Sequence, residues 1–101
     1  MNNLINRSYN SIVARGLIKQ NTLIIEFIKK VQEESNEVII EFCKCDIFYD
    51  NRKRLSEELI DLANVCLNCV KHMGFDPEKE FTKCIELQEQ RAKKKCQDQV
   101  K

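Results

Sequence analysis

The sequence predicts an all-α protein of four helices, and two features of its composition support this fold class. Only two glycines and one proline occur in 101 residues, so the chain has little material for turns. Charged residues make up 33% and hydrophobic residues 43%, a combination that favours long helices with few connections. We expect one domain over residues 1–101, since a chain of this length buries a core without disulfides or a structural metal.

The first two helices follow from local start and stop signals. A helix is predicted over about residues 3–15, and Gly16 is a natural stop for it. Residues 1–21 thus form an N-terminal helix and a connection, and Thr22 is the expected N-cap of a second helix over about residues 22–45. The apolar stripe of that second helix consists of Ile24, Ile28, Val31, Val38 and Phe42.

A third helix is expected over residues 52–73, after a loop at residues 46–51. Gly74 closes this helix. Its apolar stripe consists of Leu55, Leu59, Leu62, Ala63, Cys66, Val70 and Met73.

The fourth helix has the most distinct start, because Asp76 supplies an N-cap and Pro77 suits the first helical position. It should run to about Lys94, and residues 95–101 are expected to fray. The second and third helices are consecutive, so we expect them to form a central antiparallel pair. Their long apolar stripes favour a homo-oligomer, in which neighbouring protomers complete a bundle.

Charge and hydropathy exclude several classes of partner. The formal net charge is +1, so no overall field draws the protein to nucleic acid or to an anionic membrane. Residues 1–10 lack the apolar core of a signal peptide, and no apolar run approaches the roughly 18 residues of a membrane span. We therefore expect a cytoplasmic protein whose six cysteines are reduced thiols.

Two acidic clusters carry the main functional signal. They are Glu33-Glu34-Ser35-Asn36-Glu37 and Glu57-Glu58-Leu59-Ile60-Asp61. Each cluster contains a carboxylate pair at i, i+3 spacing, which is Glu34 with Glu37 in the first and Glu58 with Asp61 in the second. This spacing points both members of a pair to one side of their helix. Glu41 continues the first set along the edge of the apolar stripe, whereas a purely solvated face would lie opposite. Carboxylates from two neighbouring helices repel one another unless a cation lies between them, and such oxygen ligands suit Mg²⁺ or Mn²⁺ and a phosphate substrate.

These residues also resemble a known family. The pattern EExxE at residues 33–37, followed after twenty residues by ExxD at residues 58–61, resembles the signature of the MazG-like all-α nucleoside triphosphate pyrophosphohydrolases. The resemblance covers about residues 27–91 and includes the order of the helices. It implies an enzyme that forms homodimers or homotetramers and adjusts or sanitises nucleotide pools.

The resemblance implies metal ligation by Glu34, Glu37, Glu58 and Asp61, with Mg²⁺ as the cofactor and Mn²⁺ as a substitute. Water would attack a nucleoside triphosphate between the α- and β-phosphates, releasing a nucleoside monophosphate and pyrophosphate. A spare carboxylate is needed to orient or deprotonate that water, and both Glu33 and Glu37 qualify.

Basic and amide side chains are needed to bind the substrate, because a triphosphate carries more charge than one metal ion offsets. By the resemblance, Arg91 is the preferred phosphate clamp and Lys83 the second, although Cys84 and Gln88 depart from the family's pattern in this helix. Arg15 begins a segment that would close over the nucleotide pocket, and Asn64 could bind substrate. The plainer interpretation makes the fourth helix a solvated surface and Asn64 an interhelical contact.

Two other functional classes are compatible with the sequence. One is a non-catalytic helical interaction module whose acidic face binds a basic partner. The other is a zinc protein that uses Cys66-x-x-Cys69-x-x-His72 and Cys43-x-Cys45. We favour ordinary thiols over zinc, because CxxC within a helix lacks the tight loop of most zinc sites, and Cys66 falls on the apolar stripe as a small hydrophobe.

Overall fold

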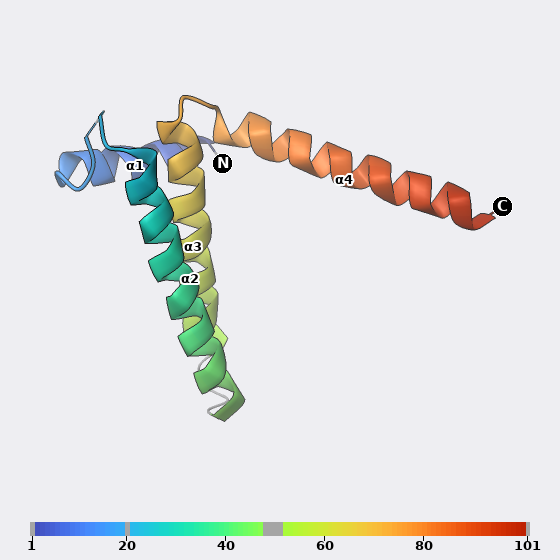
Figure 1. Ribbon diagram of the computed structural model, residues 1–101, viewed down its shortest axis with the longest axis horizontal. Helices are drawn as coiled ribbons and strands as arrows, with labels where there is room; N and C mark the ends of the chain where they lie inside the picture. Colours follow the sequence, from blue (N-terminus) through green and yellow to red (C-terminus); the bar gives the residue numbers. More distant parts are fainter. Residues whose placement is uncertain (1, 20, 48–51, 101) are drawn as a thin grey trace.

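The computed structural model of the protein is all-helical, which confirms the predicted fold class. Its four helices are α1 (Asn2–Ala14), α2 (Ile24–Ile47), α3 (Arg52–His72) and α4 (Pro77–Val100), and no strand occurs in the described part of the chain (Figure 1). The structure describes residues 2–19, 21–47 and 52–100, and the side chains of residues 3–19, 21–44 and 52–98.

Both glycines end a helix, as expected. Gly16 and Gly74 have φ angles of 72° and 93°, in the left-handed region that glycine adopts without steric cost. After α1, the N–H of Leu17 donates to the carbonyl of Ile12 and that of Gly16 to Val13, over 3.2 and 2.9 Å. After α3, the N–H of Phe75 likewise donates to the carbonyl of Val70, and that of Gly74 to the carbonyl of Lys71. These bonds satisfy carbonyls that the end of a helix would otherwise leave unpaired.

Of the two predicted N-caps, one is confirmed and one is wrong. Asp76 Oδ1 accepts the N–H groups of Glu78 and Lys79 at 3.0 and 3.3 Å, which caps α4. The Thr22 hydroxyl instead accepts the N–H of Lys19 at 2.8 Å within the connection, and α2 begins only at Ile24.

Two helices run further than predicted. α4 is helical to Val100, so the expected end at about Lys94 is wrong, while the expected fraying of residues 95–101 stays a prediction. α2 includes residues 46 and 47, which had been assigned to a loop, and the rest of that loop (residues 48–51) lies outside the described residues. In α4, Lys95, Gln97 and Gln99 have good helix propensity, which favours its continuation.

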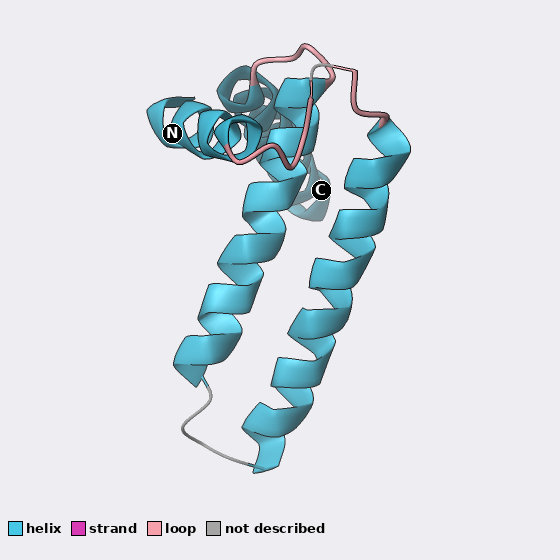
Figure 2. Ribbon diagram, turned by 90° about the vertical axis from the view of Figure 1, so that its left-hand side faces the viewer, coloured by secondary structure: helices cyan, strands magenta, loops and turns pink. Residues whose placement is uncertain are grey.

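α2 and α3 lie side by side along most of their length (Figure 2). At one end of the pair Glu41 contacts Arg54, and at the other the ring of Phe27 lies 4.7 Å from that of His72. α1 lies across the second end, and α4 leaves the same end and points away from the pair (Figure 1).

The face buried between α2 and α3 matches the predicted apolar stripes only in part, at Val31, Val38, Leu55 and Leu62. We call this face the seam. It follows a seven-residue repeat of buried and half-buried side chains, Phe27, Val31, Glu34, Val38 and Glu41 on α2 and Leu55, Glu58, Leu62, Val65, Cys69 and His72 on α3. Several predicted stripe residues are largely exposed, including Ile28, Phe42, Leu59 and Cys66. Each helix has apolar residues on more than one side, so contact with its neighbour decides which side is buried.

The single chain has a small hydrophobic core. Among the described side chains, Ile5, Phe27 and Cys69 are the buried hydrophobic residues. Large apolar side chains remain exposed on every helix, and the described side chains of α4 from residue 81 onward are all exposed. Within the described ranges, no helix combines the length and the apolar character required to cross a membrane.

Candidate metal centre and the adjoining groove

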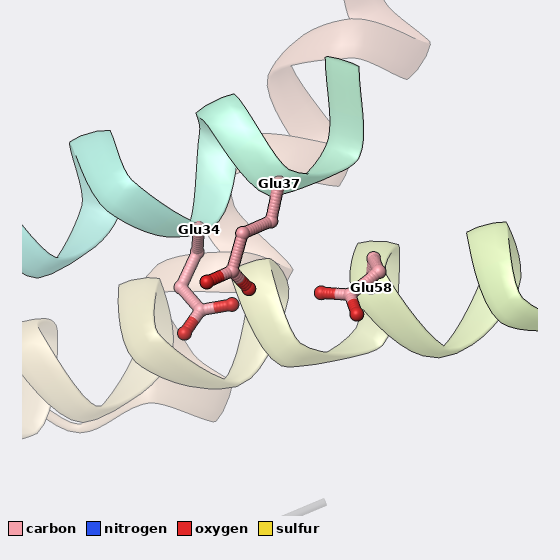
Figure 3. Close-up of side chains that lie close together, drawn as sticks. All are labelled: Glu34, Glu37 and Glu58. Carbon is pink, nitrogen blue, oxygen red and sulfur yellow. The ribbon is translucent and has the colours of Figure 1, made fainter. Parts of the chain in front are cut away.

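Three glutamates converge between α2 and α3. One carboxylate oxygen from each of Glu34, Glu37 and Glu58 lies within 4.8 Å of the others. Figure 3 shows Glu34 and Glu37 reaching from α2 and Glu58 from α3, with their carboxylates directed toward one another. The i, i+3 spacing places the first two on one side of α2, and the side-by-side packing of the two helices supplies the third.

The burial of these carboxylates is unusual. Glu34 is only 8% exposed and Glu58 is half-buried, while Glu37 remains exposed. The Oε2 atoms of Glu34 and Glu58 are buried and have no hydrogen-bond partner among the described residues. Both residues occupy seam positions at which an apolar side chain would be expected. A buried, incompletely paired carboxylate is destabilising, so the two residues are not explained by folding alone.

The donor set fits a hard divalent cation. Only carboxylate oxygens converge here, and these are the ligands that Mg²⁺ and Mn²⁺ prefer. Ligands on opposite sides of a Mg²⁺ ion lie about 4 Å apart, given a metal–oxygen distance of about 2.1 Å. The three oxygens, within 4.8 Å of one another, are close to that separation. Three carboxylates would leave further coordination positions for water and phosphate oxygens.

Lys30 places a cation beside this cluster. Its Nζ lies 3.4 Å from Glu34 Oε1 and 3.4 Å from Glu33 Oε2. Partial burial lowers the pKa of Lys30, but hydrogen bonds and charge attraction from Glu34 and Glu33 outweigh it, so the pKa is raised overall. The Lys30 side chain is therefore an ammonium ion held between the two carboxylates.

Glu41 is a buried acid that the sequence-based site did not include. It is 5% exposed, and its Oε1 lies 3.3 Å from both Lys44 Nζ and Arg54 Nε. Its Oε2, like those of Glu34 and Glu58, is buried without a partner in the described part of the chain. The sequence already indicated that Glu41 lies on the same side of the helix as Glu37, since the two residues are one helical turn apart.

A groove of about 830 Å³ adjoins the cluster. Basic side chains at its wall are Arg15, Lys29 and Lys30, and Glu33 lies on the same wall. Lys30 lines the groove and also contacts Glu34, so this side chain connects the groove to the cluster. A second acid, Glu26, also lines the groove. The other wall residues are apolar or uncharged, and they include Ile12, Leu17, Ile18, Phe27, Val65, Asn64 and Asn68.

Asparagine and serine side chains link α1 to α3 at this groove. Asn68 is fully buried, and its amide nitrogen donates to Ser8 Oγ at 3.1 Å and to Asn64 Oδ1 at 3.4 Å. Ser8, Asn64 and Asn68 all line the groove. The expected interhelical contact of an asparagine is thus made by Asn68, while Asn64 is only half-buried and lies at the groove wall.

His72 fixes the connection that forms one end of the groove. Its Nε2 lies 2.6 Å from the carbonyl oxygen of Thr22, which only accepts, so Nε2 donates. Nδ1 then accepts from the Tyr9 hydroxyl at 2.8 Å. Because Thr22 and Phe27 line the groove and both contact His72, this histidine orders its wall.

The structure brings together some of the predicted site residues. Arg15, Glu33 and Asn64 line the groove, and Glu34, Glu37 and Glu58 form the cluster. Asp61 is exposed and does not belong to the converging group. The seam passes through Glu58 and Leu62, so Asp61 falls to the side of it.

The two predicted phosphate clamps on α4 lie elsewhere in this single chain. Lys83 and Arg91 are exposed, and neither lines the groove. Lys83 pairs with Glu80 of its own helix at 3.6 Å. α4 points away from α2 and α3 after Pro77, and it carries both residues with it (Figure 1).

The cysteines do not form a metal-binding group among the described side chains. Cys66 is exposed and Cys69 is buried, so the expectation that Cys66 lies on the apolar stripe as a small hydrophobe is wrong. Both ring nitrogens of His72 are already hydrogen-bonded. Burial raises the pKa of the Cys69 thiol, with a smaller contribution from Cys66, and this opposes the thiolate form that zinc requires. The side chain of Cys45 lies outside the described residues.

Comparison with known proteins does not identify a family for this chain. No protein-family model, no curated protein and no solved structure matches it. The resemblance to MazG-like enzymes therefore rests on the acidic motifs of the sequence, and the functional argument rests on the geometry of the cluster and groove.

Proposed function

We propose that this protein is a Mg²⁺-dependent nucleoside triphosphate pyrophosphohydrolase. The observation that supports this most directly is the convergence of Glu34, Glu37 and Glu58, two of them with buried, unpartnered oxygens. A cation held by these carboxylates would offset their mutual repulsion and supply the missing partners. The cluster adjoins a groove lined by three basic and two acidic side chains, and the basic ones would bind a polyanionic substrate.

The groove has the size and chemistry for a nucleotide. Its volume of about 830 Å³ falls within the range of roughly 300–1,000 Å³ usual for small-molecule sites. Apolar side chains such as Phe27 and Val65 would contact the base, and Asn64 would hydrogen-bond to the base or sugar. Arg15, Lys29 and Lys30 would bind phosphate oxygens.

The reaction is a hydrolysis of the anhydride between the α- and β-phosphates. Bound Mg²⁺ would supply charge neutralisation on the phosphate oxygens. A water oxygen attacks one phosphorus atom, the bridging P–O bond breaks, and the leaving phosphate retains the bonding pair. Glu33 is our preferred base for the water proton, because it lies at the groove wall outside the converging group, whereas Glu37 would serve as a metal ligand. Mn²⁺ would serve as a substitute.

We further propose that the working form is a homodimer or homotetramer built around antiparallel α2–α3 pairs. The many exposed apolar side chains, among them Ile28, Phe42, Phe81 and Ile85, support this because a second copy would remove them from water. In an oligomer, Lys83 and Arg91 would bind substrate phosphate in the site of a neighbouring protomer.

The alternative of an acidic docking module is less well supported. A carboxylate that binds a basic partner must be accessible, but Glu34 is buried and already paired with Lys30. An acidic docking face gives no reason for three carboxylates to converge between helices.

The deciding experiment is pyrophosphate release from a panel of canonical and modified nucleoside triphosphates with Mg²⁺. We expect release by the native protein and a loss of at least about 100-fold on Glu58→Gln, in line with typical losses for an essential catalytic group. Glu57→Gln is the matched control, because it makes the same charge change one residue earlier at an exposed side chain. Absence of release from every nucleotide would refute the proposal.

A further inference from the structure

Lys30 has contacts that phosphate binding alone does not explain. Its ammonium group lies 3.4 Å from Glu34, a member of the converging group, and 3.4 Å from Glu33. It also lines the groove, where substrate phosphates would lie. The side chain thus reaches both the cluster and the groove.

A divalent cation and the Lys30 ammonium would compete for Glu34. At equal dielectric, a double charge about 2.1 Å from an oxygen is attracted roughly three times as strongly as a single charge at 3.4 Å. The ion would also repel a neighbouring ammonium. Since the Lys30 side chain is 54% exposed, it can leave Glu34 without disrupting the core.

We propose that Lys30 is the counter-ion of the metal-free cluster and becomes a phosphate-binding residue once a divalent cation occupies that cluster. Metal binding would release the ammonium group from Glu34 into the groove. There it would meet the phosphate oxygens of the metal-bound substrate. This inference rests on the proposed function and adds an order of events, with metal first and polyphosphate second.

The other basic residues of the groove lack the contact with the carboxylate cluster that Lys30 makes in the described structure. Lys29 lies beside it on α2 and also lines the groove, but no carboxylate contact of Lys29 is found within the described structure. Arg15 lines the groove from the connection after α1 and likewise does not contact the cluster. Lys29 is therefore a matched control with the same charge, helix and groove.

The first test measures metal binding without nucleotide. Titration calorimetry with Mg²⁺, and with Mn²⁺ as a spectroscopic probe, is compared for the native protein, Lys30→Met and Lys29→Met. We expect Lys30→Met to bind the metal at least about three-fold more tightly than Lys29→Met, because a competing ion pair is lost. Equal affinities in the two variants would overturn the inference.

The second test measures binding of inorganic triphosphate at saturating Mg²⁺. We expect Lys30→Met to weaken it about ten-fold, as for loss of a charge-assisted hydrogen bond, and Lys30→Arg to restore most of the affinity. Loss of any positive charge near the site would tighten cation binding and weaken triphosphate binding. The tighter metal binding of Lys30→Met than of Lys29→Met in the first test is therefore what distinguishes the proposed role from a simple change of charge. Unchanged triphosphate affinity in Lys30→Met would also overturn the inference.

The outcomes separate this inference from the proposed function. If the native protein binds metal and releases pyrophosphate while Lys30→Met and Lys29→Met bind the metal equally well, only the role of Lys30 is refuted. If the native protein binds no divalent cation, the metal centre itself is refuted. Lys30→Gln serves as a second variant if Lys30→Met does not fold.

Discussion

Glu34 of α2 and Glu58 of α3 both lie in the seam between these helices, and each buries an Oε2 atom with no partner in the described structure. Seam positions are normally apolar, because burial there stabilises the pairing of helices. Two carboxylates in this place reduce stability in the absence of a cation. Their placement supports the proposed metal centre.

Glu58→Leu should stabilise the metal-free protein. The change removes an unpartnered buried carboxylate oxygen and adds apolar area to the seam, so we expect the free energy of unfolding to rise by about 1–2 kcal/mol. Urea unfolding of both proteins, with EDTA present to remove divalent cations, measures the difference in the free energy of unfolding. Leu62→Ala is the contrasting variant, because it removes apolar contacts from the neighbouring seam position and should destabilise. A clear loss of stability in Glu58→Leu would contradict the functional explanation of this residue.

Mg²⁺ should raise the melting temperature of the native protein and leave that of Glu58→Leu unchanged. A ligand that binds only the folded state stabilises it by about 2.7 kcal/mol at a concentration 100 times its dissociation constant. Thermal melts with Mg²⁺ and with Na⁺ at matched ionic strength separate site binding from general screening. An equal rise in both salts would argue against a specific site.

Alkaline pH should destabilise the fold through Cys69. Burial raises the pKa of this thiol in the folded state above its ordinary value of 9.0. Above pH 9 the unfolded chain loses this proton while the folded chain retains it, so the stability falls as the pH rises. Urea unfolding between pH 7.5 and 10 in a reducing buffer should show a shallower decline for Cys69→Ala than for the native protein.

The control for that comparison is Cys84→Ala, which removes an exposed thiol. It should retain the pH dependence of the native protein. Alkylation offers a second check, since Cys69 should react more slowly than Cys84 in the folded state. Equal slopes for the native protein and Cys69→Ala would contradict the assignment.

Self-association should depend on apolar residues of α4. Phe81 and Ile85 are one helical turn apart and exposed in the single chain. We expect the double variant Phe81→Lys, Ile85→Lys to shift the native oligomer to monomer in sedimentation analysis. Thr82→Lys and Glu86→Lys on other positions of α4 should leave the assembly intact. A native protein that is monomeric at high concentration would contradict the proposed oligomer.

Local signals in the sequence predicted the helices well. Gly16, Gly74 and Asp76 act through the backbone of their own turn, and each does so in the structure as expected. Thr22 also has a capping side chain, but its hydroxyl bonds within the preceding connection. A competing local hydrogen bond of this kind is not visible in residue type alone.

The face that each helix buries was harder to predict. Of the predicted apolar stripe on α2, Val31 and Val38 are half-buried in the seam, whereas Ile24, Ile28 and Phe42 are exposed. Glu34 and Glu41 are buried at that face instead. Likewise, Asp61 matches the motif as well as Glu58 does, but only Glu58 reaches the other carboxylates. Spacing along one helix cannot determine which residues a second helix covers.

The sequence alone determined the all-α class, the helix ends at the glycines and the paired acids at i, i+3, because all of these depend on neighbours a few residues away. Only the tertiary structure decided that Glu34, Glu37 and Glu58 converge, that Lys30 contacts them, and that α4 takes Arg91 elsewhere. Those relationships depend on the packing of α2 against α3 and on the direction of the chain after Pro77. Both are set by contacts between residues far apart in the sequence.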